Sequence, residues 1–345
     1  MKKYKLYILI LLACCTLASC TKNMVLPVAS GRPYEVLVVL EDEIWEAPAG
    51  RALFDILDTD VPCLPQSERS FIISHTDPKH YDHLMQLFRN IILVKIDKTQ
   101  FSQTRMRFAL DKYATEQIVL TINTPSQESL EEFCKEHRQE VVDFLTRTEM
   151  NRLIKRLEKK YSKATDDLAL LLFSCHIFAP DELKSYKKGD HFLWTSNNTA
   201  SSLENICIYS YEYEGPESFN KEYMLHKRDS IMEKNLPGAK EGMYMQTDTL
   251  CTLVKPIVVH KDFAMEARGL WFMKNDCMGG PFVSHSRVDK ETNRVVVAEA
   301  FVYAPEKKKR DLIRRLEASL YTLQLPHEQH SLIDVGIEEE EKSKK

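Results

Sequence analysis

The apolar and polar positions of residues 34–123 follow two periods in turn, one typical of strands and one typical of helices. Residues 34–40 form a continuous β-branched and aromatic run, which predicts a buried strand. After Pro48, apolar residues recur every three or four positions and predict a helix that begins at this proline. The same criteria predict strands at 71–74, 91–96, 105–113 and 117–123, and a second helix at 78–88. This order predicts helices packed on a mixed sheet.

The longest periodic segment of the chain covers residues 124–161. Its first residues, Thr124-Pro125-Ser126-Gln127, are typical of a helix N-terminus, because a hydroxyl caps the first turn and proline suits its first position. Apolar residues then recur at spacings of three and four, with charged residues between them. The pattern predicts one long helix, or two helices with a break near Thr148, that bridges two halves of the chain.

The second half of the chain has the pattern of an antiparallel meander with two helices. Strands are predicted at 192–195, 206–213, 244–249, 257–261, 264–274, 282–288 and 294–303, and helices at 219–235 and 305–323. Residues 168–173 fit either a helix or a strand, and residues 180–189 favour a loop. The predicted fold class is therefore α+β, with two mixed or antiparallel sheets and packed helices, joined by a long helix.

These elements divide the chain into an N-terminal α/β unit at 33–123, a bridging helix at 124–161 and a C-terminal antiparallel α+β unit at 162–325. A short tether at 21–32 precedes the first unit. The tail at 326–345 ends almost wholly in charged residues and is expected to be disordered.

The first twenty residues have the pattern of a secretory signal peptide that ends in a cysteine. Three lysines precede a short apolar run at 6–12, and Ala18 and Ser19 lead into Cys20. This resembles a bacterial lipobox, in which small residues fit the peptidase and the cysteine thiol takes a diacylglycerol. The run is too short for a spanning helix, which needs roughly 20 apolar residues. We therefore expect lipidation of Cys20, rather than an ordinary secretory signal or an uncleaved anchor.

The residues after Cys20 bear on the membrane to which the chain is tethered. No aspartate follows the cysteine, whereas aspartate there favours retention in the inner membrane. No acidic cluster of the kind linked to surface export in Bacteroidetes follows either. We expect the acylated Cys20 to hold the protein on the periplasmic face of the outer membrane, since several fatty chains make such an attachment stable.

Charge and cysteine content exclude some classes of function. Removal of residues 1–20 takes three of the 47 basic residues and none of the 51 acidic ones, so the mature chain is acidic by seven charges. A mildly acidic protein is not expected to bind nucleic acid. Six cysteines follow Cys20 without any C-x-x-C spacing, so no structural zinc site is expected. Disulfides are permitted in an oxidising compartment, but the sequence does not select the pairs.

Several short motifs are distributed along the mature chain. They are Arg32-Pro33-Tyr34-Glu35, Phe88-Arg89-Asn90, Arg268-Gly269-Leu270-Trp271, Met278-Gly279-Gly280-Pro281-Phe282 and Phe301-Val302-Tyr303-Ala304-Pro305. Together they resemble an uncharacterised lipoprotein family of Bacteroidetes that is catalogued only as a domain of unknown function. The resemblance extends over nearly the whole mature chain, and it implies origin and location but no activity.

Candidate chemistry is sparse along the chain. Glu41, Asp42 and Glu43 lie where a predicted strand ends and a helix begins, with Arg51 one turn into that helix. Ligands of α/β folds often lie at such strand ends, although acidic residues also simply complement a helix N-terminus. We favour the second interpretation and assign no catalytic residue. No phosphate loop, dinucleotide fingerprint or G-x-S-x-G motif is present, and no cofactor is expected.

Two histidine clusters are candidates for metal sites. His75, His80 and His83 alternate with Asp77 and Asp82, and His80 and His83, three apart on the predicted helix at 78–88, face the same way. The favoured interpretation is the polar edge of an amphipathic helix. The segment His327-Glu328-Gln329-His330 departs from the H-E-x-x-H zinc motif by one residue. Neither cluster is assigned as a metal site.

The predicted strand at 264–274 carries large apolar groups on both faces, which is typical of a strand that is buried on both sides. The functional alternative is that Trp271, with Arg268 nearby, lines a binding groove, since tryptophan is a common anchor of interfaces. The sequence therefore favours a membrane-anchored envelope lipoprotein that binds a protein or glycan partner. The alternative is an envelope hydrolase that uses acidic residues near Asp42.

Overall fold

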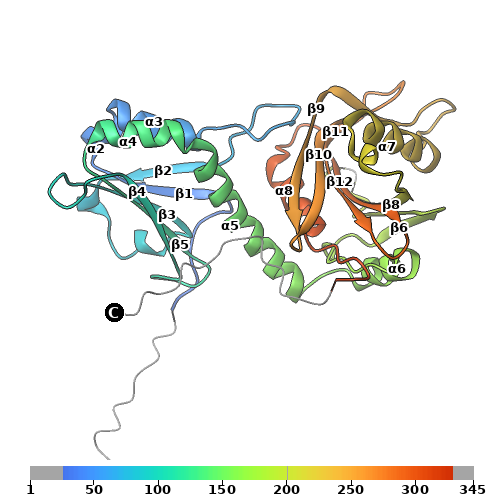
Figure 1. Ribbon diagram of the computed structural model, residues 1–345, viewed down its shortest axis with the longest axis horizontal. Coiled ribbons are helices and arrows are strands. Elements are labelled where there is room, and N and C mark those ends of the chain that lie inside the picture. The colour runs from blue at the N-terminus through green and yellow to red at the C-terminus, as the bar shows by residue number, and fades with distance from the viewer. Residues whose placement is uncertain (1–25, 200, 329–345) are drawn as a thin grey trace, which may run out of the picture.

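Two sheets with packed helices make up the computed structural model, which describes residues 26–199 and 201–328 (Figure 1). The described residues contain seven α-helices, a five-stranded sheet and a seven-stranded sheet. The predicted α+β fold class is confirmed. The structure does not describe Cys20 or the tail from residue 329 onward.

The five-stranded sheet contains every strand that the sequence predicts for the N-terminal unit. Its order is β2-β1-β3-β5-β4, and β4 alone runs antiparallel to its neighbour. Val36, Val38 and Ile92 are fully buried, as expected of apolar runs in parallel strands that are covered on both faces. The strands are β1 Glu35–Val39, β2 Ile72–Thr76, β3 Asn90–Ile96, β4 Arg105–Leu110 and β5 Ile118–Thr124.

Helices cover one face of this sheet, and an irregular segment covers the other. The helices are α2 Asp42–Trp45, α3 Pro48–Leu57 and α4 Gln127–Glu136. On the other face the predicted helix at 78–88 is wrong. The chain forms only the 3₁₀ turns η1 Pro78–His80 and η2 Met85–Leu87. Between the turns, Asp82 Oδ1 accepts hydrogen bonds from the backbone N–H groups of Leu84 and Met85, which offers the backbone an alternative to a continuous helix.

Helix α5, Arg138–Lys159, runs between the two units (Figure 1). The break in the long helical segment lies at His137, where α4 ends and α5 begins, and not near Thr148. Thr148 remains helical because its hydroxyl donates to the carbonyl of Phe144 within the helix. The first half of α5 packs in the N-terminal core, and Ile154 near its end packs with Ala318 of the other unit.

The C-terminal sheet has the order β6-β7-β8-β12-β11-β10-β9, and all neighbouring strands pair antiparallel. The predicted strands at 244–249 and 257–261 are parts of one long strand, β9, which carries a bulge. Residues 185–189, predicted as loop, form a strand. The strands are β6 Ser185–Gly189, β7 Phe192–Ser196, β8 Leu203–Glu212, β9 Met245–Val259, β10 Asp262–Met273, β11 Gly279–Asp289 and β12 Arg294–Tyr303.

Helices cover both faces of the C-terminal sheet. Helices α6 Lys163–Phe173 and α8 Arg310–Leu320 pack on one face, and α7 Lys221–Asn235 packs on the other, preceded by the turn η3 Pro216–Phe219. The ambiguous residues 168–173 are therefore helical. The two covered faces explain the large apolar groups on both sides of β10. No helix of the described residues is long and apolar enough to cross a bilayer.

The two units meet through residues 58–71, a loop that extends from the N-terminal unit toward β9 and α8 (Figure 1). The carboxylate of Glu68 accepts hydrogen bonds from the backbone N–H groups of Lys309 and Arg310, at 2.6 and 3.1 Å. The side chain of Arg314 in α8 donates to the carbonyl of Ser70. Glu68 thus caps the N-terminus of a helix that lies about 240 residues away along the chain.

Candidate functional site

A pocket of about 550 Å³ opens at one end of the seven-stranded sheet, and we name it the aromatic pocket. Three aromatic rings, two aliphatic groups and a proline make up most of its wall. The apolar lining residues are Tyr213, Pro216, Phe219, Phe263, Met265 and Val288, and the polar ones are Asn220, Asp262, Arg287 and Lys290.

The aromatic rings of the pocket come together because three strand ends meet there. Tyr213 follows the last residue of β8, Phe219 ends η3, and Phe263 is the second residue of β10. Gly215, with φ of +104°, turns the chain from β8 into η3 in a conformation that favours glycine. The ring of Phe219 lies 6.1 Å from that of Tyr213 and meets that of Phe263 edge-on at 5.1 Å. The three rings form one continuous apolar wall.

The polar groups of the pocket are mostly paired with one another or with the backbone. Lys290 Nζ donates to Asp262 Oδ2 at 2.7 Å, and this bond lowers the pKa of Asp262. Arg287 is 1% exposed, and its guanidinium contacts the carbonyl of Leu323 and the carboxylate of Glu328. Its guanidinium is therefore held mainly by groups of the protein itself.

The chemistry of the aromatic pocket favours binding over catalysis. Asp262, the one carboxylate among the lining residues, is held by Lys290 and has a lowered pKa, which suits neither a general acid nor a base near neutral pH. The described lining residues include no serine, cysteine or histidine that would serve as a nucleophile with its base. A concave, mostly apolar surface with a few polar groups is typical of ligand sites.

A second cavity, of about 530 Å³, lies at the carboxyl ends of β1 and β3, where the strand order of the N-terminal sheet reverses. This is where ligands of open α/β sheets usually bind. Of the acidic residues considered from the sequence, only Glu41 lines it, together with Tyr81, Lys95, Lys112 and other residues.

The structure does not bring the remaining predicted residues of this region into the cavity. Asp42 and Glu43 are exposed, and the nearest cation to Asp42 is the ammonium of Lys79 at 3.8 Å. Arg51 lies with its guanidinium 5.0 Å from the ring of Trp45 and donates to the carbonyl of that residue. Arg51 therefore holds the turn between α2 and α3 and does not line this cavity.

The histidine cluster loses its common face because the helix at 78–88 does not form. His75 stacks on Trp45 at 4.5 Å, and its Nε2 lies 2.8 Å from the carbonyl of Leu40, while His80 and His83 are exposed. Within residues 26–199 and 201–328, no three His, Cys, Asp or Glu side chains are grouped as metal ligands. Glu328 of the second cluster pairs with Arg287, and His330 is outside the described residues.

Trp271 is buried, which agrees with the favoured interpretation of β10 as a strand covered on both faces and not with the alternative of an exposed side chain in a groove. The side chain is 2% exposed, its ring meets Phe301 edge-on at 5.6 Å, and its Nε1–H donates to the carbonyl of Val302. Arg268 points to the opposite face of β10, where it pairs with Glu266 and with Glu317 of α8. Both residues belong to the packing of the sheet against its helices.

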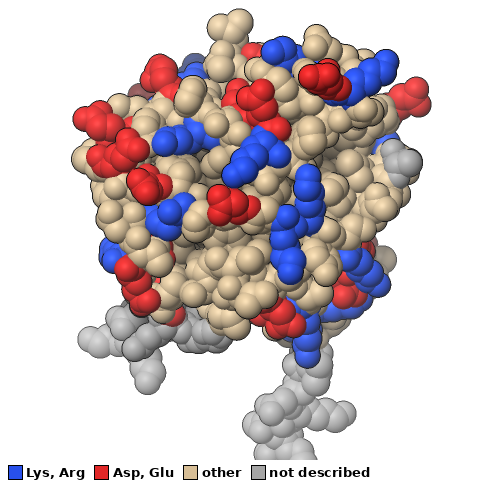
Figure 2. Space-filling view, turned by 90° about the vertical axis from the view of Figure 1, so that its right-hand side faces the viewer, with Lys and Arg blue, Asp and Glu red and all other residues tan. Residues whose placement is uncertain are grey.

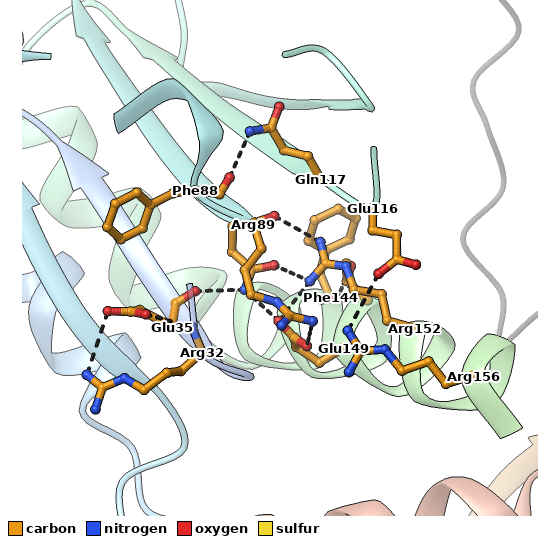
Figure 3. A network of polar contacts seen from close by, with 12 residues as sticks. Arg32, Glu35, Phe88, Arg89, Glu116, Gln117, Phe144, Glu149, Arg152 and Arg156 are labelled. Carbon is orange, nitrogen blue, oxygen red and sulfur yellow. Dashed lines mark hydrogen bonds and ion pairs between the residues drawn. The ribbon is translucent and has the colours of Figure 1, made fainter. Parts of the chain in front are cut away.

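A buried polar network joins α5 to the N-terminal sheet (Figure 3). Glu149 is 1% exposed and accepts hydrogen bonds from Arg89, Asn90 and Arg152 at 2.7 to 2.8 Å. Arg152 also donates to the side chain of Asn90 and to the carbonyl of Arg89. Burial lowers the pKa of Arg152 to about 10, although Glu149 opposes this. Since every carboxylate oxygen is already hydrogen-bonded, we assign the network to structure.

Acidic and basic side chains are interspersed on the face of the C-terminal unit that Figure 2 shows. Lysines and arginines there lie close to aspartates and glutamates, and no broad region of one sign is visible. That face therefore lacks the single-sign field that steers a polyanion.

Sequence reasoning missed the aromatic pocket because its wall comes from three segments that are distant in sequence. Tyr209, Tyr211 and Tyr213 share one face of β8, and the first two are buried under α7 as a packing stripe. Only Tyr213, at the strand end, reaches the pocket. One local feature of the sequence could have indicated the pocket. Phe263 follows the polar turn His260-Lys261-Asp262, and an exposed aromatic residue beside a polar turn is unusual.

Comparison with known proteins divides the chain in two. Residues 29–158 match the family model of a domain of unknown function (DUF8532), and residues 163–322 match that of another domain of unknown function (DUF4837). No curated protein matches the chain. The boundary between the two matches falls at the end of α5, where the N-terminal unit and its helix give way to α6.

Proposed function

We propose that this chain is a cell-envelope lipoprotein, tethered to the outer membrane through Cys20, that binds a partner protein in the aromatic pocket. The tether rests on the signal sequence and lipobox-like cysteine, and the resemblance to lipoproteins of Bacteroidetes points the same way. The observation that supports the binding role is the pocket itself, an apolar hollow with an exposed ring at its edge.

The lining of the pocket favours an apolar or aromatic side chain as the group that enters it. Phe263 is 46% exposed, so part of its ring is left in water without a covering residue. An aromatic ring that becomes buried when a partner binds is a usual anchor of protein interfaces. A sugar ring would require a dense set of free hydrogen-bonding groups, whereas Asp262 and Lys290 are occupied with each other. A glycan ligand is therefore the less favoured class.

The hydrolase alternative receives no support from the region of Asp42. Asp42 and Glu43 lie on the surface, and Glu46 pairs with Arg51 at 3.4 Å. Paired carboxylates that act as acid and base need distinct environments that separate their pKa values. Three exposed carboxylates on a short helix do not provide such environments.

The binding role is tested by replacing the exposed ring of the pocket. Phe263→Ser should leave the fold intact, because the ring is about half exposed, and should weaken partner capture at least tenfold. Phe272→Ser is the matched control, since Phe272 lies on the same strand, is 41% exposed and does not line the pocket. Each variant is used to capture envelope proteins, and the dissociation constant of a protein enriched by the control is then measured with purified components.

Three outcomes of this experiment are informative. Loss of binding in Phe263→Ser alone supports the pocket. Equal binding by the two variants overturns it. Binding of a purified envelope glycan that depends on Phe263, with no protein partner, would replace the protein ligand with a glycan.

The tether is tested separately, through the cysteine. Wild-type protein should incorporate labelled fatty acid and fractionate with the outer membrane, whereas Cys20→Ala should remain an unprocessed precursor or appear in a soluble fraction. Retention of both proteins in the membrane, with no lipid label on either, would contradict the lipoprotein assignment.

A further inference from the structure

The six cysteines of the described residues fall into two groups. Cys134, Cys175 and Cys207 are buried in the cores of the units, and burial raises the pKa of each thiol. Cys63, Cys251 and Cys277 are accessible to solvent. Of these, Cys63 and Cys251 come from different units and lie against each other, although 188 residues separate them along the chain.

Cys251 lies in a bulge of β9, the edge strand of the seven-stranded sheet. The four residues 249–252 stand opposite the single residue Gly269 of β10, because Asp248 pairs with Leu270 and Leu253 pairs with Arg268. Asp248 Oδ1 fixes the bulge by accepting hydrogen bonds from the backbone N–H groups of Leu250 and Cys251. Bulges at sheet edges direct side chains away from the ladder, and Cys251 is exposed as a result.

Cys63 lies in the loop 58–71, which extends from the other unit to this bulge (Figure 1). Its backbone has φ of +58°, a left-handed conformation that non-glycine residues rarely adopt. The thiol Sγ of Cys63 lies 3.0 Å from the carbonyl oxygen of Cys251. Because a carbonyl oxygen is about 2.4 Å from its own Cα, Sγ of Cys63 lies at most about 5.4 Å from the Cα of Cys251. The two cysteines are therefore close neighbours, and a disulfide between them requires their Cα atoms to lie about 4.4–6.8 Å apart.

We propose that Cys63 and Cys251 form a disulfide that locks the loop 58–71 of the N-terminal unit onto the bulge of β9. This inference rests on the proposed export to an oxidising compartment for its occurrence in the cell. The partner that supplies the oxidising equivalents is a thiol–disulfide oxidoreductase in its disulfide form.

The disulfide between Cys63 and Cys251 forms in two thiol–disulfide exchange steps. The thiol of Cys251, the more exposed of the two, loses its proton, and its thiolate attacks one sulfur of the oxidant's disulfide and releases the other as a thiol. Cys63, also deprotonated, attacks the sulfur of Cys251 in this mixed disulfide, and the oxidant leaves with its second thiol. The two cysteines lose two protons and two electrons, and the oxidant gains both.

The surroundings of the pair are those of a structural bond. Asp248 raises the pKa of the Cys251 thiol through a hydrogen bond, and burial raises the pKa of the Cys63 thiol. Catalytic and redox-sensing cysteines instead have lowered pKa values. The bond would close a loop of nearly two hundred residues and cover part of the exposed edge of β9.

The pairing is tested on protein isolated from the envelope after free thiols have been blocked with iodoacetamide. Digestion without reductant should give one linked peptide that joins Cys63 to Cys251. Treatment with dithiothreitol should lower the melting temperature by about 5 °C or more. Cys251→Ser should melt at the reduced value with or without reductant, while the control Cys277→Ser should keep the dependence on reductant.

A second arm separates this pairing from the location of the protein. Purified chain is equilibrated in buffers of oxidised and reduced glutathione, where only the geometry of the pair decides the result. Formation of the Cys63–Cys251 bond in these buffers supports the pairing. If the protein isolated from cells is nevertheless reduced, that result counts against export of the protein and not against the pairing. Absence of the bond in these buffers, or a bond from either cysteine to Cys277, would overturn the pairing whatever the membrane fractionation shows.

Discussion

Replacement of Glu149 by glutamine tests the buried network that joins α5 to the N-terminal sheet. The carboxylate of Glu149 faces the guanidinium groups of Arg89 and Arg152, and all three side chains are at least nine-tenths buried. Glutamine has nearly the same shape but no charge, and its amide N–H₂ turns a donor toward two groups that only donate. Two buried cations are then left without their counter-charge.

The expected cost follows from the burial of the ion pairs. Removal of one partner from a buried pair costs roughly 3–5 kcal/mol, because the remaining charge stays desolvated. For a protein of this size each kcal/mol lowers the melting temperature by about 2–4 °C, so a fall of roughly 6–20 °C is expected. The expected loss of roughly 3–5 kcal/mol is a large part of the typical unfolding free energy of about 5–15 kcal/mol.

The assay is thermal and urea unfolding followed by circular dichroism, with Glu132→Gln as the control. Glu132 is exposed on α4, so its replacement should change stability by about 0.5 kcal/mol at most. Adding Arg152→Met to Glu149→Gln should cost less than the sum of the single changes, because it removes one of the stranded cations. A Glu149→Gln protein that unfolds like the control would refute the structural role of the network.

Three further predictions follow from buried and exposed groups. Trp271→Ala should destabilise the protein by about 3–5 kcal/mol, as expected for a buried tryptophan, and thermal melting should show this loss without any selective effect on partner capture. Burial alone would raise the pKa of Glu266, but Arg268, His285 and Lys255 together outweigh it and lower the pKa well below 4.5. The stability that Glu266 contributes is therefore complete above pH 4.5 and is lost as the pH falls toward the lowered value, so melting of wild type and Glu266→Gln should converge in acid. Limited proteolysis should cut the exposed turn at 239–242 before residues 162–190, and early cleavage within 174–184, where Cys175, Ile177 and Ala179 are buried, would contradict the packing.

The central strands of the N-terminal unit were predictable because they are apolar runs bounded by polar residues. Residues 34–40 and 91–96 carry this signal in full, since parallel strands are buried on both faces. Helix boundaries were harder to predict. The break at His137 occurs between two segments of continuous apolar periodicity. The helix predicted at 78–88 competes with hydrogen bonds that the backbone N–H groups of Leu84 and Met85 donate to the carboxylate of Asp82.

The candidate site was beyond prediction for a different reason. Tyr213, Phe263 and Arg287 are separated by 50 and 24 residues, and they meet only because the order β8-β12-β11-β10 brings three strand ends together. Trp271 is the opposite example, because its sequence neighbourhood suggested a site that the structure does not contain at that position. A tryptophan close to a glycine is a pattern that can line a groove. In the structure the neighbouring Gly269 instead allows close packing, because a Cβ there would meet Phe282 and the hydroxyl of Thr252.

The contacts of the loop 58–71 indicate that the two halves of the chain are stabilised as one body. Matches to two separate domain families suggest units that fold alone, yet the N-terminus of α8 takes its cap from Glu68 of the other half. Arg314 of α8 donates to the carbonyl of Ser70 in the same loop and lies over the ring of Tyr34 at 4.1 Å, and the loop brings Cys63 to β9. A helix N-terminus that loses its carboxylate cap is destabilised by about 1 kcal/mol, and here the loss would also free a loop from an exposed sheet edge. Residues from both halves therefore contribute to the stability of each, and Glu68→Ala should lower the melting temperature of the whole chain in a single transition and not split it into two.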